Sequence, residues 1–455
     1  MAESSGRVFL FLQGPHGPFF RRLAGALAAG GAAVRRVAFN AADAAEWGGA
    51  GPLDVCTGYP EFTDYTGGAG RYAAWLGRYL EVHAVTDIVL YGDSRPEHAM
   101  AVAVAWTRGV LCHCIEEGYL RPHWVTYERW GNNGNSPLDA IPLERMAAAP
   151  APDGGTSAPD DGTSAPDGGA PPPDGWGALR PHLWYSGLYH GRLLLPSRRF
   201  GRHRSRRGMS LWHEAARYLG RLAGMPLRRA LHRRRMRWLA ASGRGYHLVL
   251  LQLSFDASMQ RYSRYRSSAA FARDCLEAFA RGAPRGEVLV FKSHPLEDGR
   301  EGLGRVIARE ARRLGLAGRV LFLDGATGLS ALLDGARSVV TVNSTGAQQA
   351  LARGLPVAAL GEAVYARPGL ASGQPLAAFF AAPAPPDRDA YRKFRQFLLA
   401  TSQIEGSFYS DAGMAVLLER LPGAMLAAED PYARALGAAG RDAVEAGAGG
   451  RRMAG

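Results

Sequence analysis

The chain has 455 residues, more than one hydrophobic core usually holds, so its length predicts two domains with additional segments. Hydrophobic residues make up 47% and charged residues 21%, as in a globular protein, and no apolar run of about 18 residues is present that could span a membrane. The net charge of +13 is confined to residues 198–237, which hold fourteen arginines and one acidic residue, whereas the remainder is close to neutral.

Residues 1–146 alternate between apolar runs that are typical of buried strands and segments with helical periodicity. In chain order these segments are 7–14, 18–32, 34–40, 72–85, 87–96, 96–109 and 110–122. We expect the first run to be a strand rather than a signal peptide, because it is short and leads into Gly-Pro. The alternation predicts an N-terminal Rossmann-like domain with a parallel, doubly wound sheet, whose ligands bind beyond the carboxyl ends of the strands.

Two segments interrupt this pattern. Residues 147–176 repeat the unit TSAPD and are nearly all Ala, Pro, Asp, Gly, Ser and Thr, so we expect a disordered insertion that cannot bury a core. Residues 177–243 mix arginine with aromatic and apolar residues, which predicts a helical linker able to lie at a membrane interface. An arginine-rich helix that only faces solvent is the alternative.

A second strand–helix series at residues 244–385 predicts another Rossmann-like domain, followed by closing helices at 386–430 and a flexible tail at 431–455. The predicted fold class is therefore α/β and GT-B-like, with two Rossmann-like domains, a cleft between them and a C-terminal helix that crosses back. GT-B is the architecture of many glycosyltransferases and some epimerases, although other two-domain α/β enzymes share the same periodicity.

Polar side chains stand at three strand ends of the first domain. They are the candidate acceptor-side residues Gln13, His16, Asp93, Arg95, Glu116 and Glu117. Adjacent strand residues point to opposite faces, so only one of the two glutamates is expected to face a ligand, and two solvated glutamates are the alternative.

Three further strand ends carry polar residues in the second domain. Gln252 and Asp256 follow the first of these strands, where Asp256 is either a cleft carboxylate or a helix cap. Lys292 and His294 are two apart on an extended backbone, which Pro295 maintains, so both should point to one face and suit a phosphate. A surface histidine beside a turn is the alternative for His294.

The stretch Asn-Ser-Thr-Gly ends another apolar strand at the start of a helix. Ser344, Thr345 and Gly346 there offer hydroxyls, backbone amides and a close approach, which predicts an anion cradle, and Ser344 can equally be a plain helix cap.

The four cysteines form no CxxC pair, as expected in a reducing, cytoplasmic compartment. Cys112 and Cys114 flank His113, but strand alternation places both thiols on one face, where apolar packing is favoured over metal binding. We therefore expect neither a metal site nor a cofactor. GxGxxG and Walker motifs are absent, which disfavours dinucleotide-dependent dehydrogenases and P-loop enzymes.

Six stretches between residues 7 and 400 together resemble the KpsS-type capsular polysaccharide biosynthesis proteins, kin to KpsC. They are FLQGPHGPFFRRLA, YGDSRPEH, EEGYLRPHWVTYE, LLQLSFDASMQ, VFKSHPLEDG and VNSTGAQQALARGLPVAALGEAVYARPGL, in this order. The resemblance implies a retaining β-Kdo transferase that moves Kdo from CMP-β-Kdo to a lysophosphatidylglycerol-type lipid. It also implies a cytoplasmic protein that is peripheral on the inner face of the inner membrane.

The resemblance further implies roles for single residues. Asp256 matches the carboxylate that attacks the anomeric carbon, and Glu116 matches the candidate acid/base for the acceptor hydroxyl, with Glu117 left open for that role. His294 and Pro295 match the His-Pro motif that holds the phosphate of CMP. The same comparison assigns Ser344 and Thr345 to the phosphate-side loop and places Lys292 where it can assist.

The expected partners are the CMP-sugar donor, the lipid acceptor, an anionic membrane surface that meets residues 198–237, and other capsule biosynthesis and export proteins. Nucleic acid is disfavoured because the two α/β halves are neutral. Two alternatives stay open. One is another GT-B-type enzyme, such as a glycerophosphotransferase or a sugar epimerase, and the other is a non-catalytic export or scaffold protein. Neither alternative needs Asp256 as a nucleophile.

Overall fold

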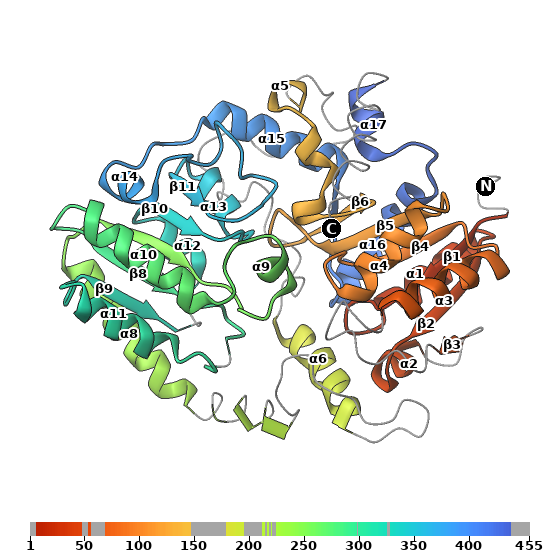
Figure 1. Cartoon of the computed structure of the whole chain (residues 1–455), viewed down its shortest axis with the longest axis horizontal. Coiled ribbons are helices and arrows are strands. Elements are labelled where there is room, and N and C mark those ends of the chain that lie inside the picture. The colour runs from red at the N-terminus through yellow and green to blue at the C-terminus, as the bar shows by residue number, and fades with distance from the viewer. Residues whose placement is uncertain are drawn as a thin grey trace. The chain divides into compact units, whose positions relative to one another are not determined.

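The computed structural model describes residues 6–47, 53–55, 69–146, 179–194, 212–213, 216–217, 220, 224–297, 299–324 and 328–437 (Figure 1). The chain forms two compact units. The first holds Met1–Ala158, Gly169–Leu211 and Gln396–Gly455, and the second holds Pro159–Gly168 and Trp212–Arg395. The predicted insertion at 147–176, much of the arginine-rich segment and most of the tail lie outside the described residues.

The first unit is built on a seven-stranded sheet with the order β12-β6-β5-β4-β1-β2-β3. Its strands are β1 (Val8–Phe11), β2 (Ala33–Ala38), β3 (Leu53–Val55), β4 (Asp87–Tyr91), β5 (Leu111–Glu117), β6 (Trp124–Arg129) and β12 (Gln403–Glu405). Strands β3-β2-β1-β4-β5 are parallel and have the order of a Rossmann sheet, whereas β6 and β12 are antiparallel additions at one edge.

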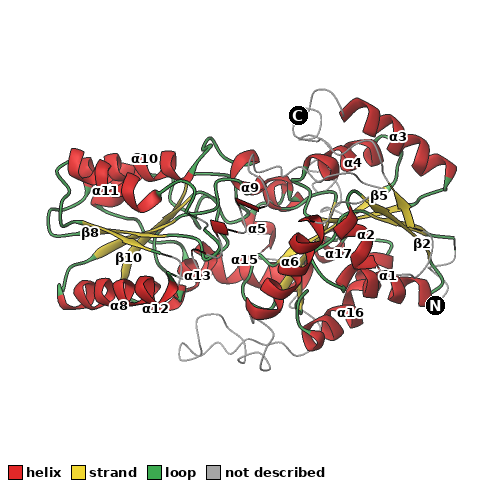
Figure 2. Cartoon of the chain, turned by 90° about the horizontal axis from the view of Figure 1, so that it is seen from below, coloured by secondary structure: helices red, strands yellow, loops and turns green. Residues whose placement is uncertain are grey.

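Helices cover both faces of this sheet. One face packs under α1 and α16 around Phe9, Phe11 and Ile115, and the other packs under α3 and α4 around Leu10 and Leu90 (Figure 2). The helices of the unit are α1 (Phe19–Ala29), α2 (Ala41–Trp47), α3 (Ala69–Val82), α4 (Pro96–Trp106), α5 (Leu143–Met146), α6 (Leu179–Leu194), α16 (Asp411–Leu426) and α17 (Pro431–Leu436), with 3-10 turns at Asn133–Asn135 and Pro137–Ala140.

The second unit has a five-stranded parallel sheet with the order β11-β10-β7-β8-β9, which is the Rossmann order again. Its strands are β7 (Tyr246–Leu250), β8 (Val288–Lys292), β9 (Val320–Leu323), β10 (Ala336–Thr341) and β11 (Val357–Ala359). Its helices are α8 (Met225–Ala241), α9 (Ala257–Arg261), α10 (Ser268–Gly282), α11 (Leu303–Arg313), α12 (Leu329–Leu333), α13 (Ala347–Ala352) and α14 (Leu376–Ala381).

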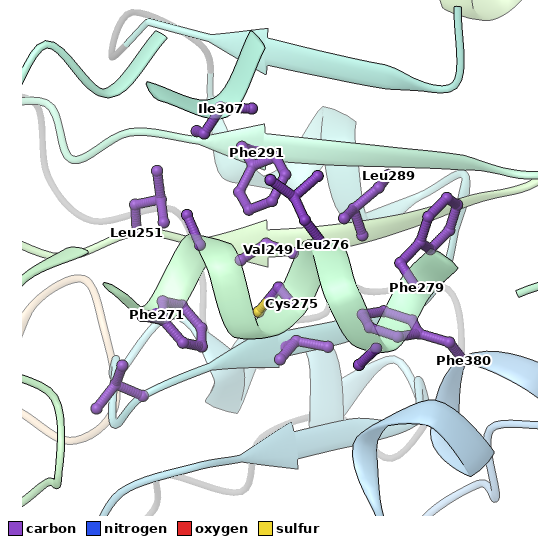
Figure 3. Close-up of a cluster of buried hydrophobic side chains, with 14 of the residues drawn as sticks. Val249, Leu251, Phe271, Cys275, Leu276, Phe279, Leu289, Phe291, Ile307 and Phe380 are labelled. Atoms are coloured by element: carbon purple, nitrogen blue, oxygen red, sulfur yellow. The ribbon is translucent and has the colours of Figure 1, made fainter. Parts of the chain in front are cut away.

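The core of the second unit explains why its strands are apolar throughout. Phe271, Cys275, Leu276 and Phe279 of α10 pack onto one face of β7 and β8, next to α11 (Figure 3). Helices α8 and α12 lie on the opposite face (Figure 2). Strands covered on both faces have no solvent-facing positions, so they read as continuous apolar runs rather than alternating ones.

The predicted fold class, α/β with two Rossmann-like domains, is confirmed by these two sheets. Helix α15 (Arg388–Thr401) begins in the second unit and ends in the first, so the chain returns at its C-terminal end, as expected. There β12 pairs with β6, and the Tyr432 hydroxyl donates a hydrogen bond to the buried Glu128 carboxylate at 2.5 Å. The cleft between the domains stays a prediction.

Cys112 and Cys114 lie in the apolar cluster under α3 and α4, so the predicted packing role is confirmed. His113 between them points to the other face, where its ring nitrogens lie 2.8 Å from Asp87 Oδ1 and 2.9 Å from the Tyr127 hydroxyl. Of the helices in the described residues, none is long and apolar enough to cross a bilayer.

Candidate functional site

The loops after β1 and β4 meet at the point where the strand order of the first sheet reverses, the usual ligand position in such sheets. Arg95 Nη1 donates a hydrogen bond to Gln13 Oε1, and Gln13 Nε2 donates to Asp43 Oδ1 at 2.8 Å. The structure therefore brings together two residues that the sequence predicted separately, and it adds a carboxylate that the sequence did not single out.

Asp43 lies in α2 and is the centre of a buried network. Besides Gln13, the Tyr189 hydroxyl donates to Oδ1 at 2.7 Å and the backbone N–H of Phe39 donates to Oδ2 at 3.1 Å. Asn40 Nδ2 donates to the Tyr189 hydroxyl at 2.8 Å. Burial raises the pKa of Asp43, and these hydrogen bonds oppose that rise.

Tyr189 belongs to α6, which the sequence had assigned to a linker. In the structure α6 packs against α2, and the Tyr189 ring stacks on His16 with ring centroids 4.2 Å apart. His16 Nδ1 also lies 2.9 Å from the Ser186 hydroxyl. Helix α6 therefore covers the carboxyl end of β1, and His16 is held by it.

A small surface hollow, open to solvent, lies beside this network. It is lined by Gln13, Gly14, Pro15, Gly17, Phe20, Arg21, Asp43, Glu46 and Trp47. The backbone N–H of Gly17 donates to Glu46 Oε1 at 2.8 Å. Gly17 has φ +107°, and a Cβ there would lie 3.0 Å from the Tyr185 ring, so only glycine suits this position.

Burial, with a smaller contribution from the nearby Asp43, raises the pKa of Glu46 to about 8, although the hydrogen bond from the Gly17 N–H and the charges of Arg192 and Arg95 lower it. The Glu46 carboxyl consequently holds a proton near neutral pH, and it can donate a hydrogen bond to an oxygen of a ligand in the hollow.

Glu116 and Glu117 point to opposite faces of β5, since Glu116 follows Cys114 on the α3/α4 side and Glu117 follows Ile115 on the α1/α16 side. Glu116 Oε2 accepts a hydrogen bond from Asn133 Nδ2 at 2.6 Å. Glu117 lies 3.5 Å from Arg121 Nη1. Both predicted residues therefore lie at the carboxyl end of β5, but their side chains point to opposite faces of the sheet.

Asp93 lies in the loop after β4, where it is buried, and it forms hydrogen bonds with the loop that follows β6. Its Oδ2 accepts hydrogen bonds from Asn135 Nδ2 at 2.8 Å and from the backbone N–H of Asn132 at 3.4 Å. These contacts give Asp93 a structural role beside the candidate site.

In the second unit, the loops after β7 and β10 are joined by two amide side chains. Gln252 Nε2 donates to Asn343 Oδ1 at 2.8 Å, and the backbone N–H of Asn343 donates to Gln252 Oε1 at 3.0 Å. Asn343 Nδ2 also donates to the carbonyl of Ser258 at 3.1 Å. Gln252 therefore holds the reversal point of this sheet together, and it positions α9.

Asp256 is the N-cap residue of α9. Its Oδ1 accepts a hydrogen bond from the backbone N–H of Ser258 at 3.1 Å, and the side chain is exposed at the carboxyl edge of the sheet. The capping role is what the alternative interpretation predicted, and a capping carboxylate with an exposed side chain can also meet a ligand.

Lys292 ends β8 and is 8% exposed on the side of α8. Within the part of the chain that the structure describes, its ammonium group forms no hydrogen bond or ion pair. Burial lowers the pKa of Lys292. The pKa of His232 on α8 is lowered mainly by burial, and the positive charges of Arg235 and Lys292 lower it further. The nearby Asp324 pairs instead with Arg228, at 3.4 Å.

His294 follows Lys292 and is half-buried, and Pro295 after it is exposed. His294 Nδ1 accepts a hydrogen bond from the backbone N–H of Leu296 at 3.1 Å, so in the neutral ring the proton is on Nε2, which can donate to a ligand.

The predicted anion cradle precedes α13, a helix of six residues. The Ser344 hydroxyl accepts a hydrogen bond from the N–H of Gly346 at 3.2 Å, and the Tyr365 hydroxyl donates to the Ser344 carbonyl at 2.6 Å. A Cβ on Gly346 would lie 2.9 Å from Leu329. Ser344 therefore caps the turn, and an anion-binding role for Ser344, Thr345 and Gly346 stays a prediction.

The family model described as capsule polysaccharide biosynthesis protein matches residues 86–150 and 187–409. The chain belongs to this family. Its members include, by similarity, the capsule polysaccharide export protein KpsS of Escherichia coli, which is 29% identical over 409 residues, covering 89% of this chain and 97% of KpsS. The predicted resemblance to KpsS-type capsule proteins is thereby confirmed.

Two further capsule proteins are similar along most of their length. The capsule polysaccharide modification protein LipB of Neisseria meningitidis serogroup B is 28% identical over 430 residues, covering 90% of this chain and 93% of LipB. Among solved structures, Thermosulfurimonas dismutans KpsC, a beta Kdo 2,7 transferase, matches with a TM-score of 0.43 and 12% identity, covering 91% of this chain and 99% of that one.

Sequence reasoning missed Asp43, Glu46, Tyr189 and Asn343. Asn343 stands directly before the predicted Ser344 loop, so the signal for it was present. The other three lie on helices, and nothing in their own sequence neighbourhood separates them from ordinary helix residues.

Proposed function

We propose that this capsule protein is a retaining β-Kdo transferase that moves Kdo from CMP-β-Kdo to a lysophosphatidylglycerol-type lipid and so initiates the capsular polysaccharide linker. Membership of the capsule polysaccharide biosynthesis family supports the general role. The donor, the acceptor and a place on the inner face of the inner membrane are the finer parts of the proposal.

The observation that carries the proposal is Lys292. Lys292 is only 8% exposed and forms no ion pair with a carboxylate among the described residues, so an anion that joins its ammonium group would offset the cost of this partial desolvation. Lys292 lies at the carboxyl end of β8, two residues before His294, whose Nε2–H can donate. The phosphate of a CMP-sugar suits both groups, because it is a diester in the donor and gains negative charge as the bond to the sugar breaks and CMP leaves as a monoester.

Asp256 is proposed as the nucleophile. Its carboxylate forms a bond to the anomeric carbon of Kdo while the bond from that carbon to the CMP phosphate oxygen breaks, and CMP departs with the electron pair. Lys292 and His294 stabilise the charge on the departing phosphate. The cap hydrogen bond from Ser258 orients the Asp256 carboxylate for this attack.

The second displacement restores the original configuration. Glu116 is proposed to take the proton of the acceptor hydroxyl as its oxygen attacks the anomeric carbon and displaces Asp256. The hydrogen bond from Asn133 fixes the orientation of the Glu116 carboxylate.

Lipid contact is supported by α8, whose exposed side chains Leu227, Leu231 and Trp238 recur on one helical face. The exposed arginines of this helix are Arg229, Arg233, Arg234 and Arg237. Apolar side chains among arginines suit the surface of an anionic bilayer, as the sequence predicted for residues 198–237.

The test combines CMP-Kdo, generated in situ, with a fluorescent lysophosphatidylglycerol and three purified proteins. Asp256→Asn keeps a good helix cap and removes the carboxylate, so transfer should fall by at least about 10³-fold. Asp387→Asn is the matched control, because exposed Asp387 also caps a helix, accepting from the N–H groups of Asp389 and Ala390, and it should transfer normally.

CMP binding separates the alternatives. Lys292→Met should weaken CMP binding roughly tenfold or more without loss of stability, because it removes a buried cation that lacks a partner. Transfer by Asp256→Asn at the wild-type rate would contradict the nucleophile and favour an epimerase-like or glycerophosphotransferase reaction. Wild-type protein that neither transfers Kdo nor binds CMP would favour an export or scaffold role.

A further inference from the structure

Helix α6 presents an apolar outer face. Leu183, Trp184 and Leu188 are 46%, 65% and 40% exposed, and Gly187 and Gly191 complete the exposed surface between them. On an ordinary surface helix the polar residues would occupy this face. Exposed apolar side chains that cluster in this way mark a contact surface, whereas single ones do not.

The opposite face of α6 is the polar one. His182, Ser186 and Tyr189 point inward, where Ser186 and Tyr189 contact His16 and Tyr189 donates to Asp43. His182 packs edge-on against Tyr409, with ring centroids 4.5 Å apart. The helix is therefore anchored firmly by its polar side, and its apolar side has no such anchor among the described residues.

The charge carried by α6 itself is positive. Helix α6 contains no Asp or Glu, and Arg192 is exposed on the same face as Leu188. The sequence that follows the helix, residues 195–211, adds six arginines and no acidic residue. A partner for this surface must therefore combine apolar and anionic groups.

We propose that the outer face of α6 docks into the interface of an anionic lipid bilayer, with Leu183, Trp184 and Leu188 entering the headgroup–acyl boundary. The 16-residue helix is too short and too polar to cross the membrane, so it lies in the plane of the surface. Tryptophan favours this depth, and Arg192 pairs with lipid phosphate.

This contact has a consequence for the substrate, which rests on the proposed function. One face of α6 is proposed to meet lipid, and the opposite face contacts His16 and Asp43. The width of one helix therefore separates a lipid headgroup at the bilayer surface from these polar residues.

The test is co-sedimentation of the full-length chain with two kinds of vesicle, phosphatidylcholine alone and phosphatidylcholine mixed with phosphatidylglycerol. The triple variant Leu183→Ser/Trp184→Ser/Leu188→Ser should partition into the mixed vesicles roughly tenfold or more weakly than the wild type. Val82→Ser is the matched control, because Val82 is 76% exposed at the end of α3 in the same unit, and it should bind like the wild type.

Insertion depth gives an independent readout. A polarity-sensitive dye on Trp184→Cys should shift to shorter wavelength when mixed vesicles are added, and the same dye on Val82→Cys should not. The cysteines among the described residues are buried, which favours selective labelling. Circular dichroism spectra equal to the wild type show that each variant is folded.

Wild-type partitioning by the triple variant, or a dye at position 184 that stays in water, would overturn the proposal. A change in oligomeric state without any change in vesicle binding would overturn it too and assign the face to a protein contact. None of these measurements depends on catalysis. The membrane-docking proposal can therefore be contradicted while the Kdo-transfer proposal is supported, and the reverse is also possible.

Discussion

In the first unit the loops at the reversal of strand order are joined by Arg95, Gln13 and Asp43, whereas in the second unit they are joined by Gln252 and Asn343. The strand order is the same in both sheets, so the backbone does not explain this difference. The first junction links Arg95 to the Asp43 carboxyl group through the amide of Gln13, and it is covered by α6. The second consists of neutral amides and leaves the charge of Lys292 at the same edge without a carboxylate partner among the described residues.

The difference shows how one scaffold provides two kinds of ligand chemistry. A neutral junction does not compete for an anion, so Lys292 remains available for a phosphate. In the first junction Arg95 already donates to the amide oxygen of Gln13, and the adjoining hollow offers the protonated Glu46 carboxyl, which suits hydroxyl groups. The donor and acceptor sides proposed above follow this division.

The largest effect is expected from breaking the first junction. Asp43→Ala leaves Gln13, Tyr189 and the backbone N–H of Phe39 without their shared acceptor, so the free energy of unfolding should fall by about 3–5 kcal/mol. Denaturant unfolding measures the loss, and hydrogen exchange should locate it in peptides of the first unit. Asp411→Ala removes an exposed carboxylate that pairs with Arg22 at 2.7 Å, and as a control it should cost about 1 kcal/mol or less.

A smaller effect is expected at the neutral junction. Gln252→Ala and Asn343→Ala should each lower the free energy of unfolding by about 1–2 kcal/mol, because only uncharged hydrogen bonds are lost. The double variant should lose less than the sum, with a coupling energy of about 1 kcal/mol. Strict additivity would show that the two amides do not act as one junction.

An effect of opposite sign is expected at Glu46. Its pKa in the folded chain is about 8, above the ordinary value near 4.5, so the folded state binds more protons between these values and stability falls as pH rises through that window. Glu46→Gln cannot ionise, so its melting temperature should exceed that of the wild type at pH 8, and the difference should shrink as the pH falls to 5.

Glu419→Gln, an exposed substitution on α16, is the control for that comparison. Glu128 also has a pKa raised by burial to about 8, but it is present in both proteins and cancels in the difference. An equal shift at both pH values would show that Glu46 does not titrate in this window.

The polar strand ends could be predicted because each follows an apolar run along the chain. That is how Gln13, Arg95, Gln252 and Lys292 were found. Their partners could not be predicted in the same way. The Gln252–Asn343 contact depends on β7 and β10 being neighbours, and strand order is a property of the assembled sheet rather than of any local segment.

The contact between Tyr189 and Asp43 was hidden for a second reason. The two residues are 146 positions apart, and the arginine-rich composition of the surrounding sequence predicted a linker for the helix that carries Tyr189. Composition describes the average chemistry of a segment. It does not reveal that one face of α6 packs into the first unit while the other stays exposed.

The return of the chain to its first sheet affects how the protein is made. Strand β12 and helix α16 complete the first unit, and Tyr432 joins Glu128 beneath its edge. Residues Trp212–Arg395, by contrast, form one uninterrupted stretch of the second unit. During vectorial synthesis at the ribosome, the second unit can therefore finish folding first. The first unit, although its N-terminal strands are synthesised earlier, cannot complete its sheet until β12 and α16 have been synthesised near the end of translation.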